Sequence, residues 1–194
     1  RSSGWASDQH VYFCIKFNRP MHNWYSQGMD AHYGEATFEL SPGDQVMAKV
    51  ALSPTSEANA MLNMNREMPG NFDFKAVAQA ASEAWDTQLA RVKATFRTER
   101  ERRIFYTAMY HFMVAPQTWC DVSGDYMGAD LQVRRCAKYE TLTTWSLWDT
   151  YRAAHPLATI IMPDRMADYA HTMMAIYREH GELPMWHLVS NETY

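Results

Sequence analysis

The sequence predicts an α+β protein with more than one domain: an antiparallel β-region, linker helices and the start of a helical barrel. Before residue 54, apolar residues alternate with a period of two, whereas after it they recur every three or four residues. In the second part, helical stretches of similar length are separated by turns that prolines mark. This arrangement is typical of stacked antiparallel helix pairs.

Three strands are expected in the first part, at residues 8–17, 35–40 and 45–52, with a loop or hairpin end at 24–33 and a turn at 41–44. Each strand shows apolar side chains at every second position, as expected when one face of a sheet is buried. Three strands alone are marginally stable, so this β-region is expected to need partners from elsewhere.

Three helices follow, and their ends carry recognisable signals. The first is capped by Thr55 or Ser56 and runs to about residue 68, and the second spans 73–94. The third begins at Thr98, whose capping-box partner is Glu101, and ends before a proline at residue 116. We assign residues 55–97 to linker helices.

The region 116–140 is expected to be irregular. Its three aspartates, Asp121, Asp125 and Asp130, alternate with glycines, and we favour the tight turns of a hairpin or Ω-loop over a calcium loop. Two further helices are expected, at 141–155 and from Pro163 to a glycine cap at residue 181.

Residues 146–156 hold an unusual combination of side chains. As one helix ended by Pro156, they would place Trp148, Arg152 and His155 on one side, with Asp149 beside them. An indole can stack on the apolar face of a sugar, and a carboxylate can accept hydrogen bonds from its hydroxyls. The alternative is a surface Asp149–Arg152 ion pair beside a core tryptophan.

Composition excludes several classes of protein. The net charge is −4 without a basic run, so nucleic acid is not an expected partner, and we expect neither a signal peptide nor a membrane span in this chain. The cysteines Cys14, Cys120 and Cys136 lack the spacing of a zinc site. Free thiols are favoured, although Cys120 and Cys136 flank one loop and could pair.

Several motifs resemble the glycoside hydrolase family 92 α-mannosidases over essentially the whole chain. They are RSSGWASDQ, KVALSPTSEAN, FYTAMYH, the aspartate-rich segment 121–130, SLWDTYRAAHP, LPMWHL and NETY. The resemblance implies an N-terminal β-sandwich followed by an (α/α)6 toroid. It places the end of the sandwich at residues 1–54, linker helices at 55–97 and the first helical hairpins at 98–194.

The resemblance also implies a function: inverting, calcium-dependent, exo-acting removal of α-linked mannose from glycans or glycoproteins. The catalytic acid and base would lie C-terminal to Tyr194, so no catalytic residue and no metal ligand is assigned in this chain. Trp148, Asp149, Asn191 and Glu192 would line the terminal-mannose site, and Arg152 is added from its helical position. Ser190 replaces the glycine that usually precedes the Asn-Glu-Thr motif.

On this interpretation the chain is an internal part of a secreted or periplasmic enzyme, and its partners are a mannose-containing glycan and the remainder of its own polypeptide. Two alternatives stay open. One is another α/α-barrel glycosidase or phosphorylase that acts on glucosides, and the other is a non-catalytic sugar-binding or structural module.

Overall fold

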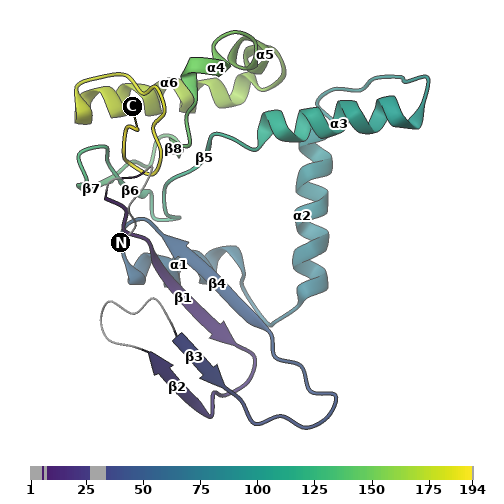
Figure 1. The fold of residues 1–194 in the computed structure, drawn as a ribbon, viewed down its shortest axis with the longest axis vertical. Coiled ribbons are helices and arrows are strands. Elements are labelled where there is room, and N and C mark those ends of the chain that lie inside the picture. Colours follow the sequence, from purple (N-terminus) through teal and green to yellow (C-terminus); the bar gives the residue numbers. More distant parts are fainter. Residues whose placement is uncertain (1–5, 7, 27–33, 194) are drawn as a thin grey trace.

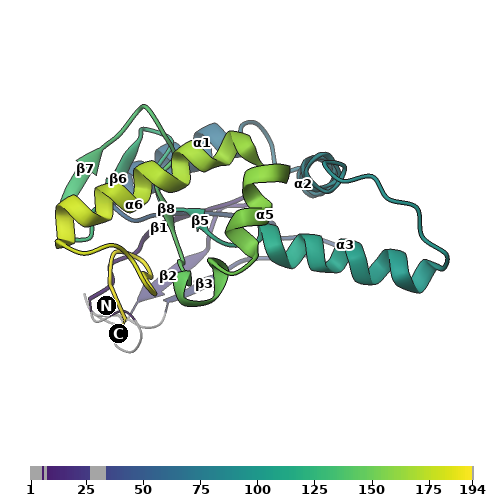
Figure 2. The same cartoon turned by 90° about the horizontal axis from the view of Figure 1, so that it is seen from above.

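The computed structural model describes residues 6, 8–26 and 34–193. The expectations for residues 1–5 and 7 of the first motif, for residues 27–33 of the loop and for Tyr194 lie outside these residues. A β-region forms one end of the molecule, and α4, α5 and α6 form the other (Figure 1). Helices α2 and α3 project to one side (Figure 2). The molecule is thus α+β, as predicted.

The β-region consists of two antiparallel ribbons. Strand β1 (Tyr12–Phe17) pairs with β4 (Ala48–Ser53), and β2 (Asn23–Ser26) pairs with β3 (Gly34–Thr37). The three predicted strands are present but shorter, and β2 occupies part of the segment expected to be a loop or hairpin end. The first and last strands of this region therefore pair with each other rather than with their sequence neighbours.

The two faces of the β1–β4 ribbon differ sharply. Phe13 pairs across the ribbon with Leu52, and Ile15 pairs with Val50, and all four side chains are exposed. The opposite face packs on α1 (Glu57–Glu67). The alternation in the sequence thus marks an apolar face that nothing among the described residues covers.

The first three helices begin at or next to the residues expected from the sequence. The side chain of Ser56 caps α1, Asp73 caps α2 (Phe74–Leu89), and Thr98 caps α3 (Glu99–Met113), each by accepting the backbone N–H three residues on. Helix α2 ends at Leu89, earlier than expected, because the chain tightens there into i→i+3 hydrogen bonds.

The region 116–140 is a set of short antiparallel strands and turns. Strand β6 (Asp125–Met127) pairs with β7 (Val133–Arg135), so the predicted hairpin is present. Strand β5 (Gln117–Thr118) pairs with β8 (Leu142–Thr143). The thiols of Cys14, Cys120 and Cys136 are free, as favoured from the sequence.

The single helix expected at 141–155 is wrong. Its first residues form β8, and the rest divides into α4 (Leu147–Thr150) and α5 (Ala154–Ile161). Pro156 does not end a helix but lies in the first turn of α5, where a missing N–H leaves no hydrogen bond unmade. Helix α6 (Met166–His180) follows the 3-10 turn η1 (Pro163–Arg165) and ends at Gly181 with φ +96°, as predicted.

A small core joins these elements. Leu142 and Trp145 pack against Tyr169 and Ile176 of α6 and are buried with them. Trp145 thereby fixes the start of α4 relative to α6. No helix among the described residues combines the length and the apolar character needed to cross a bilayer.

Candidate functional site

Helix α4 presents two of the predicted site residues, Trp148 and Asp149, at the surface. Its single turn is closed by N–H groups of Asp149 and Thr150, which both donate to the Ser146 carbonyl at 3.0 Å. The Ser146 hydroxyl also donates to Asp149 Oδ2 at 2.9 Å. The indole of Trp148 is 57% exposed and Asp149 is exposed beside it. The turn therefore offers an apolar ring and a carboxylate to a ligand.

A second indole, which the sequence analysis did not assign to the site, stands next to Trp148. Backbone hydrogen bonds from Leu147 N–H to the Met185 carbonyl (2.8 Å) and from Trp145 N–H to the His187 carbonyl (2.9 Å) hold residues 185–187 along the start of α4. The ring centroids of Trp148 and Trp186 lie 6.2 Å apart with an interplanar angle of 54°.

Glu192 organises this segment. Its Oε2 accepts the N–H of Met185 at 2.8 Å, and its Oε1 accepts the N–H groups of Trp186 at 2.8 Å and Thr193 at 3.0 Å. The Thr193 hydroxyl donates to the Trp186 carbonyl at 2.9 Å. Glu192, expected to contact sugar, thus contacts the backbone that carries Trp186.

Asn191 is buried and ties the N-terminal segment to this loop. Its side-chain amide donates to the carbonyls of Asp8 (3.0 Å) and Val189 (2.9 Å), and its Oδ1 accepts the N–H of Asp8 at 3.2 Å. The preceding Ser190 adopts φ +71°, the left-handed conformation that glycine would adopt with less strain. Its hydroxyl donates to the Met127 carbonyl at 2.6 Å, which helps to hold that conformation.

Arg152 and His155 do not join Trp148 on one helix face, because α4 ends at Thr150. Arg152 lies over the ring of Tyr151, with its guanidinium carbon 5.6 Å from the ring centroid. Among the described residues, Asp149 and Arg152 do not form an ion pair with each other. His155 instead faces the core, 5.5 Å from the Tyr169 ring, and burial lowers its pKa. The prediction that Trp148, Arg152 and His155 share one helix face is therefore wrong.

His187, the residue after Trp186, is 3% exposed. Neither of its ring nitrogens has a hydrogen-bond partner among the described residues. Burial lowers the pKa of His187 to about 4, although the charge of Glu192 opposes the shift. The imidazole is therefore neutral at pH 7. The LPMWHL motif was the only sequence signal for Trp186 and His187.

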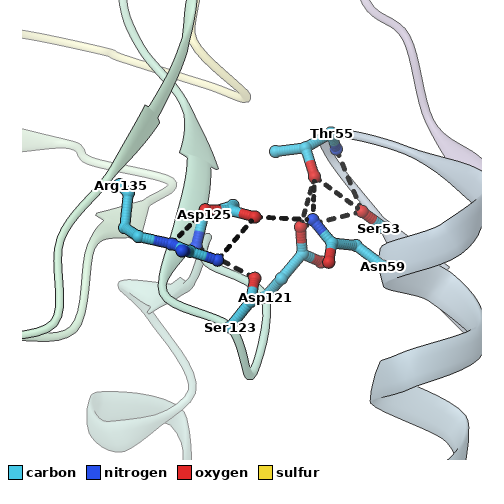
Figure 3. A network of polar contacts seen from close by, with 7 residues as sticks. All are labelled: Ser53, Thr55, Asn59, Asp121, Ser123, Asp125 and Arg135. Atoms are coloured by element: carbon cyan, nitrogen blue, oxygen red, sulfur yellow. Dashed lines mark hydrogen bonds and ion pairs between the residues drawn. The ribbon is translucent and has the colours of Figure 1, made fainter.

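A different polar centre lies where the β-region meets the hairpin β6–β7 (Figure 3). Asp121 is 3% exposed. Its Oδ2 accepts from the hydroxyls of Ser53 (2.9 Å) and Thr55 (2.5 Å), and its Oδ1 accepts from the amide of Asn63 at 2.7 Å. All its donors come from the end of β4 and from α1 and the turn before it.

Asp125 extends this network on its outer side (Figure 3). It accepts from the Asn59 amide at 3.0 Å and forms an ion pair with Arg135 at 2.7 Å. The Asn59 hydrogen bond is the main cause that lowers the pKa of Asp125, with smaller contributions from Ser123 and Arg135. Within the described part of the chain, no three His, Cys, Asp or Glu side chains are grouped to hold a metal ion.

The α-mannosidase of glycoside hydrolase family 92 from Bacteroides thetaiotaomicron superposes with a TM-score of 0.85 at 27% identity, covering 98% of this chain and 28% of that protein. It is also known in complex with mannoimidazole. An inverting mannosidase of the same family from Bacteroides thetaiotaomicron VPI-5482 gives a TM-score of 0.81 at 25% identity, with coverage of 96% and 27%.

Among curated proteins, an uncharacterized secreted glycosidase of Arthroderma benhamiae is 35% identical over 78 residues, which is 39% of this chain and 10% of that protein. The chain thus spans less than a third of the relatives it matches. Residues 59–194, which are most of the sequence, match the catalytic domain of glycosyl hydrolase family 92. The chain belongs to glycosyl hydrolase family 92.

Proposed function

We propose that residues 1–194 are part of an inverting exo-α-mannosidase, in which they help to hold the terminal mannose. The observation that carries this proposal is the exposed Trp148–Asp149 pair on α4, with the Trp186 indole beside it. An indole covers the apolar face of a sugar ring, while a carboxylate with free lone pairs accepts bonds from hydroxyls. The relatives named as mannosidases, one of them in complex with mannoimidazole, support the same substrate.

Five residues have roles in this proposal. Trp148 stacks on the sugar, and Asp149 accepts from its hydroxyls through the lone pairs that Ser146 leaves free. Arg152, which follows α4 and lies over Tyr151, donates to the sugar from outside that turn. Asn191 and Glu192 shape the loop that forms the opposite wall.

The catalytic acid and base belong, in this proposal, to another part of the polypeptide. Inversion requires two carboxyl groups about 6.5–9.5 Å apart, one to protonate the leaving oxygen and one to activate water. Glu192 accepts three backbone N–H groups, so its carboxylate has a positioning role. Asp149 has the role of a hydrogen-bond acceptor for the sugar hydroxyls.

Calcium does not fit the described residues by themselves. Asp121 and Asp125 have protein donors, and no group of three candidate ligands exists in the described ranges. We therefore propose that calcium, implied by the family resemblance, is bound mainly by residues elsewhere in the polypeptide, and no catalytic step is assigned to it here.

The exposed face of the β1–β4 ribbon supports the proposed domain boundaries. Residues 1–54 would complete a β-sandwich whose second sheet covers Phe13, Ile15, Val50 and Leu52. Residues 55–97 would be linker helices, and 98–194 would begin an (α/α)6 toroid. We propose a mannose-containing glycan or glycoprotein as substrate and a secreted or periplasmic location, which the name of the fungal relative supports.

The test uses the full-length gene product that contains residues 1–194. It is expected to hydrolyse an aryl α-mannoside but not the matching α-glucoside, to release β-mannose as seen by proton NMR, and to lose activity with a calcium chelator. Residues 1–194 alone are expected to show no turnover. Preferred hydrolysis of the glucoside would establish the alternative barrel glycosidase, and binding without turnover would establish a sugar-binding module.

A further inference from the structure

We infer that Glu192 is a positioning residue: its carboxylate holds Trp186 so that the indoles of Trp148 and Trp186 form one two-sided platform for the sugar ring of the substrate. The sugar as occupant rests on the proposed function. The inference goes beyond the proposed function in two ways: it makes the two indoles one binding surface, and it names Glu192 as the residue that positions Trp186.

The hydrogen bonds of Glu192 support the indirect role. A carboxylate offers about four lone-pair positions, and backbone N–H groups of Met185, Trp186 and Thr193 occupy three of those of Glu192. Thr193 also binds the Trp186 carbonyl. Both polar groups of the Trp186 backbone are therefore fixed by residues 192 and 193.

The geometry of the indoles supports the platform. Their centroids are 6.2 Å apart and their planes are inclined at 54°, so the two rings form an open angle rather than a closed stack. Trp148 is 57% exposed and Trp186 is 38% exposed. Two large exposed aromatic side chains in contact are typical of a binding surface.

The neighbouring Asp149 selects the occupant. An apolar protein segment that covered both indoles would also take this exposed carboxylate out of water, and its only side-chain donor among the described residues is Ser146. A sugar ring supplies an apolar face for the indoles and hydroxyl donors for the carboxylate. The surface therefore fits a pyranose better than a purely apolar partner.

The fold should survive loss of the Glu192 charge. Residues 185 and 187 are also held by the N–H groups of Leu147 and Trp145, which do not involve Glu192. Glu192→Gln leaves one acceptor oxygen but points an amide donor at a backbone N–H. We therefore expect a folded protein in which Trp186 is less firmly placed.

The first experiment needs no sugar. In the full-length gene product, the two indoles should give an exciton couplet in the circular dichroism spectrum, and Trp148→Phe or Trp186→Phe should remove it. Glu192→Gln should weaken it strongly, and Thr193→Val should weaken it less. The matched controls are Trp24→Phe on β2 and Glu83→Gln on α2, both of which should leave it intact. An unchanged couplet in Glu192→Gln would overturn the positioning role.

The second experiment measures binding of mannoimidazole by calorimetry. Trp186→Ala should weaken binding about 10- to 100-fold, the range expected when a large apolar contact is lost. The double variant Glu192→Gln/Trp186→Ala should bind no more weakly than Trp186→Ala alone. Additive losses would mean that Glu192 contacts the ligand directly and would overturn the inference. No binding by the wild type would overturn the mannosidase proposal and the sugar as occupant, a result independent of the couplet.

Discussion

Asp121 and Asp149 are two aspartates of one chain in opposite situations. Asp121 is 3% exposed and accepts from three side chains, whereas Asp149 is exposed and accepts from the side chain of Ser146. Hydrogen bonds within the fold occupy most acceptor positions of the Asp121 carboxylate. The Asp149 carboxylate keeps acceptor positions that a ligand could use. The difference separates a residue that holds two regions together from one suited to binding.

The same contrast applies to the surroundings of each residue. The donors of Asp121 are a serine, a threonine and an asparagine, all neutral, and removal of Asp121 would take away one buried hydrogen bond from each of them. Asp149 is exposed beside the Trp148 indole, so its removal would not leave a buried polar group without a hydrogen bond. Substitutions at the two sites should therefore act on different measured quantities.

The largest effect is expected for Asp121→Ala. It removes three buried hydrogen bonds to a carboxylate, each of which contributes about 1.5–3 kcal/mol, so the free energy of unfolding should fall by at least about 3 kcal/mol. Denaturant titration of the full-length protein measures this. The control Asp130→Ala, which removes a surface ion pair with Arg134 on the same hairpin, should cost under about 1 kcal/mol. Equal losses would break the comparison.

Acidification should destabilise the protein through His187. Burial lowers its folded-state pKa to about 4, below its ordinary value of 6.5, so between these pH values the unfolded chain binds a proton that the folded chain does not. Stability is retained above pH 6.5 and falls as the pH approaches 4, by about 3 kcal/mol for this group. Unfolding curves of wild type and His187→Phe should therefore diverge across this window; parallel curves would contradict the assignment.

Asp149→Asn should change catalysis and leave stability nearly unchanged. Replacing a charged acceptor by an amide should cost about 1.5–3 kcal/mol per hydrogen bond to the sugar, which lowers kcat/KM about 10- to 150-fold. The measurements are aryl α-mannoside kinetics and the melting temperature of the full-length protein. Unchanged kinetics with a lower melting temperature would make Asp149 a structural residue like Asp121.

The smallest effect is expected for Arg91→Ala. Arg91, two residues after the end of α2, forms a bidentate ion pair with Asp164 of η1 at 2.6 and 2.8 Å, but the Asp164 side chain is 55% exposed. The loss in unfolding free energy should stay under about 1 kcal/mol. Arg97→Ala, which removes an ion pair with Glu101 in which the arginine is almost fully exposed, serves as the matched control. A loss as large as that of Asp121→Ala would show that exposure does not separate the two classes.

Local features of the fold were predictable from the sequence. Two predicted caps, Ser56 and Thr98, start their helices as expected, because a capping side chain acts on a backbone N–H only three residues away. Gly181 ends α6 for a similarly local reason. The alternation in β1 and β4 predicted strands correctly, but it could not show that their apolar face is exposed here.

The parts that were missed depend on distant partners. Leu142 and Thr143 pair with β5, which removes them from the helix that the local pattern suggested. The place of Trp186 beside Trp148 depends on hydrogen bonds between residues 145–147 and 185–187, about forty positions apart in the sequence. The motifs identified Trp148 and Asp149 as candidates, but only the fold shows that Glu192 binds backbone.

The Asp121 network has a consequence for how this chain tolerates changes in length. Ser53 and Asp121 are 68 positions apart in the sequence, and their hydrogen bond closes a long excursion that contains α2 and α3. Because the cost of closing a flexible loop grows only logarithmically, by about 0.6 kcal/mol for each doubling of its length, such an excursion can lengthen or shorten at little expense. Insertions and deletions accumulated between residues 70 and 115 should therefore leave the register between β4 and the β6–β7 hairpin unaltered.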